Sequence, residues 1–188
     1  MKTRFFPKRL LPVCLYIWDP IEERFCPMVK QMVEIRELME YNDEVRRRYF
    51  ECMTKLPWSE FVEDREASWG SLRNIFIHTL GATDYWLDFL QNENLRSKRK
   101  FDEYETSAEV GAYMERVETR MRDYLNALPV GGLKKQYTIK NDLNETVEIT
   151  AEDVLIHVFE EEVHHRGELI ALLWQMDIEP PLMGWKKL

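Results

Sequence analysis

The stretch VLIHVFEEEVHHRGELIALLWQM, residues 154–176, says most about this chain. Its pattern is helical, and it is apolar enough that we expect nearly all of it to be buried. At about 100° per residue, five polar side chains share about a quarter of the helix circumference: His157, Glu161, His164, His165 and Glu168. Imidazoles and carboxylates are costly to bury without a partner. A metal ion would satisfy several of them at once, so a metal site is the hypothesis to test.

The spacing of these residues limits which of them can bind one ion. Glu161 and His165 are four residues apart, so their side chains stack on one helix face, as two ligands from one helix do. His157 is one turn from Glu161 but about 12 Å from His165, so both histidines cannot readily join Glu161 at one ion. A third ligand has to come from another helix, and His78 is the only histidine outside this one. The alternative for His78 is a hydrogen-bonded core residue.

Composition and charge narrow the class of protein. A chain of 188 residues that is 45% hydrophobic and 32% charged is typical of one soluble globular domain. The net charge of −8 argues against a nucleic-acid partner. The number of cysteines (Cys14, Cys26 and Cys52) is odd, and no CxxC pair occurs, which indicates reduced thiols in a cytoplasmic protein. We expect the basic clusters at 46–48 and 96–100 to lie on the solvated surface.

The first 27 residues differ from the rest of the chain. A basic start is followed by the apolar run 10–18, which Pro12 interrupts and which is too short to span a bilayer. We therefore expect no membrane partner. Residues 1–27 are interpreted as an extension, either poorly ordered or the product of a misassigned start codon, and residues 28–188 as the folded domain.

Four helical patterns follow, at residues 28–54, 71–94, 106–128 and 150–176. Ser71 before the second, and Thr150 with Asp153 three residues on before the fourth, are candidates for N-caps. Residues 136–150 alternate around a polar turn, which predicts a small β-hairpin between helices three and four. Four amphipathic helices in one chain predict an all-α four-helix bundle, in which sites lie between facing helices.

Two segments together resemble a known family. HVFEEEVHHRGELIALLWQM and the earlier IFIHTLGATDYWL, residues 75–87, look like the two histidine-bearing helix motifs of the DinB/YfiT-like metalloprotein superfamily. The resemblance covers about residues 28–176 and implies a four-helix bundle with a three-histidine divalent-metal site. Carried over residue by residue, it puts the metal ligands at His78, Glu161 and His165. Glu161 stands where the family has a histidine, and Glu168 stands where it has a glutamine.

The change at position 161 alters the chemistry of the implied site. Glu161 can ligate through oxygen, which gives a set of two histidines and one carboxylate. Zinc accepts this set with an open fourth position, and nickel, iron and manganese accept it too. We expect zinc or nickel, with iron or manganese as further candidates. The alternative is that Glu161 marks a lost site on a metal-free scaffold.

The neighbours of this set each have more than one interpretation. His157 is expected either to hydrogen-bond Glu161 or a substrate, or to cap a buried backbone group. His164 is expected to pack or hydrogen-bond between helices, and Tyr85 to face the mouth of the pocket. The catalytic residues stay unknown, with these three as candidates for supporting roles. The rest of the acidic run 160–162 is interpreted as a solvated edge.

Two classes of function follow from the resemblance. The first is a metal-dependent enzyme acting on a small molecule, either an S-transferase for a low-molecular-weight thiol such as bacillithiol or mycothiol, or a hydrolase. The second is a non-catalytic, stress-induced metal-binding or scaffold protein. An open coordination position would distinguish an enzyme from a closed structural site. We also expect a cytoplasmic protein. We expect it to form a homodimer, because bundles of this type often pair through a helix face.

Deleting residues 1–25 should leave the domain folded, because the apolar periodicity that specifies the bundle begins near Met28. Thermal unfolding of the full-length and truncated proteins measures this. A large loss of thermal stability on truncation would show instead that the run 10–18 packs on the bundle or on a partner subunit.

Overall fold

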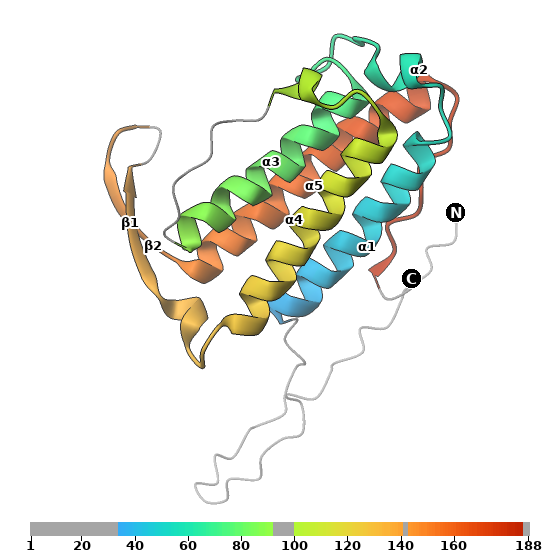
Figure 1. The fold of residues 1–188 in the computed structure, drawn as a ribbon. Coiled ribbons are helices and arrows are strands. Elements are labelled where there is room, and N and C mark those ends of the chain that lie inside the picture. Colours follow the sequence, from blue (N-terminus) through green and yellow to red (C-terminus); the bar gives the residue numbers. More distant parts are fainter. Residues whose placement is uncertain (1–33, 92–99, 141–142, 186–188) are drawn as a thin grey trace, which may run out of the picture. The chain divides into compact units, whose positions relative to one another are not determined.

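Four long helices lie side by side in a bundle (Figure 1). The computed structural model describes residues 34–91, 100–140 and 143–185, and the helices in these ranges are α1 (Ile35–Met53), α3 (Leu72–Leu90), α4 (Ser107–Ala127) and α5 (Ala151–Gln175). α1 and α5 run in one direction, and α3 and α4 run in the other (Figure 1). α3 contacts α4 and α5, and α1 contacts the same two helices. The predicted all-α bundle is confirmed.

Polar side chains set where three of these helices begin. Ser71 accepts a hydrogen bond from the backbone N–H of Asn74, as predicted for the N-cap of α3. Thr150 and Asp153 form a reciprocal capping box at α5, and Thr106 forms another with Glu109 at α4. Each cap satisfies backbone N–H groups that the first helical turn leaves without a partner. The predicted starts are therefore correct for α3, α4 and α5. The predicted start of α1 lies outside the described residues.

Smaller elements join the helices. The predicted hairpin is present as β1 (Gln136–Lys140) paired antiparallel with β2 (Thr146–Thr150). It lies at one end of the bundle (Figure 1), where the Tyr137 hydroxyl donates to the carbonyl oxygen of Leu90 at 2.9 Å. Three short elements were not expected from the sequence: the helix α2 (Trp58–Val62) and the 3₁₀ turns η1 (Phe101–Glu103) and η2 (Gly132–Lys134).

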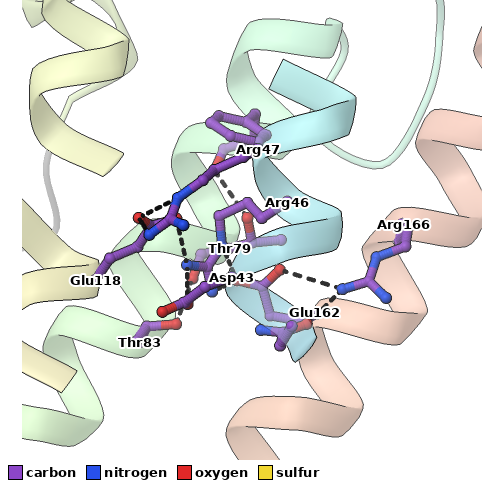
Figure 2. Close-up of polar contacts among 10 residues, drawn as sticks. Asp43, Arg46, Arg47, Thr79, Thr83, Glu118, Glu162 and Arg166 are labelled. Carbon is purple, nitrogen blue, oxygen red and sulfur yellow. Dashed lines mark hydrogen bonds and ion pairs between the residues drawn. The ribbon is translucent and has the colours of Figure 1, made fainter. Parts of the chain in front are cut away.

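The core consists of two apolar clusters separated along the bundle by polar side chains. One cluster includes Tyr49, Phe76 and Leu172, and the other includes Met39, Leu87 and Leu155. Buried polar residues from all four long helices lie between the clusters and form what we call the polar layer. Its members are Asn42 and the residues Arg46, Thr79, Thr83, Glu118, Glu162 and Arg166, which Figure 2 labels. Burying a polar group is costly unless it has a hydrogen-bond or charge partner. The side chains of this layer therefore need partners from the neighbouring helices.

Arg46 lies at the centre of the polar layer. Its Nε and Nη2 atoms donate to Oε1 of Glu162 at 2.9 and 2.5 Å, and Nη1 donates to Oδ1 of Asp43 at 2.8 Å. Glu118 receives two hydrogen bonds from Arg47, at 2.9 and 2.6 Å. Arg166 donates to Oδ1 of Asn42 and lies 4.0 Å from Oε2 of Glu162. These contacts join α1, α4 and α5 at mid-bundle.

The polar layer overturns two expectations about the surface. Arg46 belongs to a cluster expected to be solvated, and Glu162 to a run interpreted as a solvated edge, yet each is only 4% exposed. The two charges neutralise each other across 116 residues of sequence, which makes their joint burial tolerable. Neither helix pattern alone reveals its partner, so each residue by itself resembles an ordinary surface charge.

α5 is less buried than its apolar sequence predicted. The side chains of Ile156, Val163 and Trp174 are exposed, because α5 packs mainly on α1 and α3 and keeps one face outside the bundle. None of the helices in the described residues is both long enough and apolar enough to cross a membrane.

Arg46→Met should lower the free energy of unfolding by about 3–5 kcal/mol, because it removes the opposite charge closest to the buried Glu162 and leaves only the more distant Arg166. Arg46→Met/Glu162→Met should recover part of that loss, since it removes both charges. Arg48→Met is the matched control on the same helix: Arg48 pairs with the exposed Glu44, and such pairs contribute less than about 1 kcal/mol. Urea unfolding of the four proteins measures this, and equal losses in the two single variants would contradict it.

Candidate metal centre

Three potential metal ligands converge where α3 faces α5. Oε1 of Glu161 lies 3.0 Å from Nε2 of His78 and 3.2 Å from Nε2 of His165. One ligand atom from each residue can be chosen so that all three lie within 4.8 Å of one another. The structure thus brings together the three residues to which the family resemblance pointed. Two of them, His78 and Glu161, are 83 positions apart in the sequence.

The rotation of α5 about its axis explains this convergence. Glu161 and His165 are one turn apart, and each is followed by a residue of the polar layer, Glu162 and Arg166. Successive residues of a helix point about 100° apart. Because Glu162 and Arg166 pair with α1, Glu161 and His165 are turned toward α3. His78 lies within α3, away from its two ends.

The three side chains differ in burial. The side chain of His165 is 7% exposed, whereas those of His78 and Glu161 are 23% and 29% exposed. The cluster is therefore buried on the His165 side and partly open to solvent on the other. Burial by itself would raise the pKa of Glu161, but hydrogen bonds and charge from His78 and His165 outweigh it and hold that pKa below its usual value. Glu161 is an ionised acceptor at neutral pH.

Each of the two imidazoles, those of His78 and His165, makes a further side-chain contact. The Trp69 ring stacks on that of His78, with centroids 4.1 Å apart and planes at 21°. On the other side, Nδ1 of His165 lies 2.6 Å from Oε2 of Glu168, which also accepts a hydrogen bond from Oγ of Ser68 at 2.8 Å. Burial would raise the pKa of Glu168, but these hydrogen bonds from His165 and Ser68 bring it below its usual value.

Three residues predicted to support the site lie outside the cluster. His157 is exposed, and its ring centroid is 5.4 Å from that of Trp86 rather than near Glu161. Tyr85 is 40% exposed and also contacts Trp86. His164 is exposed instead of packing between helices, because it lies on the outer side of α5, with its ring centroid 4.9 Å from that of His165.

Sequence reasoning assigned no role here to Ser68 or Trp69. Both precede α3 in the connection from α2, and nothing in their spacing points to α5. Glu168 carried a signal, since it lies three residues after His165 and on the same helix face. A second possible ligand group, His164, His165 and Glu168, shares His165 with the first.

The donor set fits a divalent ion. In a tetrahedral site with ligand distances of about 2.1 Å, neighbouring donor atoms are about 3.4 Å apart, and the two measured separations are 3.0 and 3.2 Å. If His165 donates from Nδ1 to Glu168, its Nε2 presents a lone pair to the Glu161 carboxylate. Two acceptors that face each other at this distance require a cation between them, either a proton or a metal ion.

Comparison with known proteins agrees with the resemblance seen in the sequence. A sequence model of the DinB family matches residues 28–186, which includes all four long helices and every residue of the centre. No curated protein matches the chain.

Glu161→Gln should reduce the acid sensitivity of the metal-free protein. A carboxyl group whose folded pKa lies below its unfolded value of about 4.3 stabilises the fold above that value, and the contribution is lost as the pH falls through the folded pKa. Wild-type protein should lose this contribution as the pH falls below about 4.3, whereas Glu161→Gln has none to lose. Urea unfolding with a chelator, above and below that pH, measures the difference. Glu160→Gln, an exposed neighbour on α5, is the control, and an unchanged pH dependence in Glu161→Gln would contradict the prediction.

Proposed function

The chain belongs to the DinB family, and on this basis we propose that it is a divalent-metal-dependent enzyme whose ion is bound by His78, Glu161 and His165. Members of this family generally bind metal, and the described residues contain a donor group suited to it. The observation that carries the proposal is the convergence of both Nε2 atoms on one carboxylate oxygen, at 3.0 and 3.2 Å.

The ligand set favours zinc or nickel, and also accommodates iron or manganese. Glu161 replaces the neutral imidazole of the family pattern with an anion. It neutralises more of the charge of the ion, so a water or thiol bound there should be less acidic than at a three-histidine site. The two histidines keep the site selective for transition metals over magnesium or calcium, which prefer oxygen ligands.

The exposure of the centre supports catalysis rather than a purely structural role. Structural zinc sites are closed by four protein ligands, whereas catalytic sites keep a position for an exogenous ligand. Here three ligands converge, and the side chains of His78 and Glu161 are partly open to solvent. A divalent ion bound there would act as a Lewis acid that lowers the pKa of a thiol or of a water molecule.

We propose a small-molecule substrate, with S-transfer from a low-molecular-weight thiol and hydrolysis as the two candidate reactions. In the first, the sulfur forms a bond to an electrophilic carbon while the leaving group departs with its bonding electrons and the thiol proton passes to solvent. In the second, water is the nucleophile. The residues of the chain have the same task in both: Glu161 and the histidines orient the nucleophile, and buried His165 closes one side of the centre to water.

The ligand assignment is tested by metal titration of chelator-treated protein. Wild-type protein should bind one equivalent of Zn²⁺ or Ni²⁺. His78→Ala and His165→Ala should abolish tight binding, and Glu161→Gln should weaken it. Glu161→His restores the family's set and should bind at least as well. His157→Ala is the matched control, since His157 lies on the same helix but contacts Trp86. If His157→Ala abolishes binding while His165→Ala does not, the assignment is wrong.

The catalytic part of the proposal is tested by the openness of the loaded site. Co²⁺-substituted protein should change its visible absorption when a low-molecular-weight thiol is added, because sulfur enters the open position. Assays of thiol consumption with an electrophilic acceptor, and of ester or amide hydrolysis, then separate the two reactions. A stoichiometric site whose spectrum no thiol or small anion alters would contradict catalysis and favour a metal-binding protein without enzymatic activity.

A further inference from the structure

A short turn before α3 contacts one imidazole of the proposed centre and the carboxylate that lies against the other. Residues 67–70 form this turn, closed by a hydrogen bond from the backbone N–H of Gly70 to the carbonyl oxygen of Ala67 at 3.0 Å. Its two central residues are Ser68 and Trp69. Ser68 donates to Glu168, which lies against His165, and Trp69 stacks on His78. One turn therefore reaches the two histidines through two different contacts.

The turn is held firmly against the start of α3. Gly70 has a φ of +82°, a backbone conformation that glycine adopts readily and other residues rarely do. Its carbonyl oxygen accepts from the backbone N–H of Arg65 at 2.8 Å, and the side chain of Asn74 donates to the carbonyl oxygen of Trp69 at 2.9 Å. Because Asn74 is in the first turn of α3, the turn keeps its place relative to the helix that carries His78.

The contact with Glu168 decides which nitrogen of His165 faces the centre. An ionised carboxylate can only accept hydrogen bonds, so the 2.6 Å contact requires the proton on Nδ1 of His165. Its Nε2 is then the nitrogen that faces Oε1 of Glu161, 3.2 Å away, and an incoming ion replaces any proton held between these two atoms. Metal-binding histidines usually donate their second N–H to a carboxylate or carbonyl oxygen, which sets both the tautomer and the ring orientation.

The contact with Trp69 restrains the other imidazole. A parallel stack with centroids 4.1 Å apart leaves the His78 ring little freedom to turn about its bond to Cβ without separating the two faces. The indole is in turn fixed by the edge of Phe101, whose centroid is 5.8 Å away. The ring of His78 is thereby held with Nε2 toward Glu161.

We propose that Ser68, Trp69 and Glu168 are positioning residues that make both histidines present Nε2 to Glu161, so that the metal centre is arranged before an ion binds. This inference rests on the proposed function and adds to it the residues that orient the ligands. None of the three is itself needed as a ligand. Their role is to reduce the ordering that metal binding would otherwise require.

The first test is made on metal-free protein and so does not depend on metal binding. Long-range ¹H–¹⁵N correlation spectra report whether Nδ1 of His165 carries a proton, at a pH about two units above the ordinary imidazole pKa. We expect a protonated Nδ1 in wild-type protein and in Glu168→Gln, whose amide oxygen still accepts. Glu168→Leu should lose this signature. An unprotonated Nδ1 in wild-type protein, or an unchanged spectrum in Glu168→Leu, would overturn the inference.

The second test measures Co²⁺ affinity by competition with a chelating dye. Glu168→Leu should weaken binding by about 10–100-fold, the usual effect of removing such a partner, whereas Glu168→Gln should retain most of the affinity. Glu160→Leu, an exposed carboxylate lost from the same helix, is the control and should bind as wild-type protein does. A binding stoichiometry of two ions, lost together with Glu168, would show that Glu168 is a ligand of a second site and would overturn the positioning role.

Variants of the turn test its two contacts separately. Ser68→Ala and Trp69→Leu should each weaken Co²⁺ binding, and Trp69→Phe should restore affinity because it keeps a flat face for His78. Trp58→Leu is the control for a general loss of stability. It removes the indole of Trp58 in α2, which packs on Phe61. Affinities in Ser68→Ala and Trp69→Leu equal to that of Trp58→Leu would overturn the inference. If wild-type protein binds no divalent metal but keeps the Glu168-dependent tautomer, the proposed function fails while the positioning contacts stand.

Discussion

The ion pair between Arg46 and Glu162 is the constraint on which the rest of the structure depends. Both charges are buried at mid-bundle, where an unpaired charge would be very costly. α5 therefore has one rotation about its axis that keeps Glu162 against α1. That rotation turns the preceding residue, Glu161, toward α3, and the same relation holds one turn later for His165 and Arg166. The buried ion pair thus also determines where the proposed metal ligands point.

The polar layer also fixes the position of α5 along the bundle. Apolar clusters lie on both sides of the layer, so a shift of α5 by one turn, about 5.4 Å, would move Glu162 among apolar side chains. Apolar packing alone tolerates such shifts better, because one leucine can replace another at a similar site. Buried ion pairs add little net stability in many proteins, but they penalise wrong arrangements. In this bundle the arrangement they favour is also the one that brings His78, Glu161 and His165 together.

The centre uses opposite kinds of environment on its two sides. His165 is buried and held by Glu168, whereas Glu161 and His78 are partly open to solvent. A buried, hydrogen-bonded ligand resists displacement, while the open side admits an exogenous molecule. If an ion binds at the proposed centre, the carboxylate at position 161 would add an anion where the resemblance implies an imidazole, and a water or thiol bound to that ion would be less acidic. The scaffold is that of the family, and the departures from its pattern are Glu161 among the proposed ligands and Glu168 beside them.

Local sequence determined the four long helices, the N-caps of three of them and the hairpin, and it placed Glu161 and His165 on one face, because these features depend on residues within one or two turns of each other. The capping box of Thr150 and Asp153 shows this, since both members are visible in four consecutive residues. The resemblance to the family added His78. Only the tertiary structure decided that Arg46 and Glu162 are buried, that His157 lies apart and that Trp69 stacks on His78. Arg46 and Glu162 meet across 116 residues of sequence, and Trp69 reaches His78 from the connection before α3. No local pattern records which charge or ring a side chain will meet through such contacts.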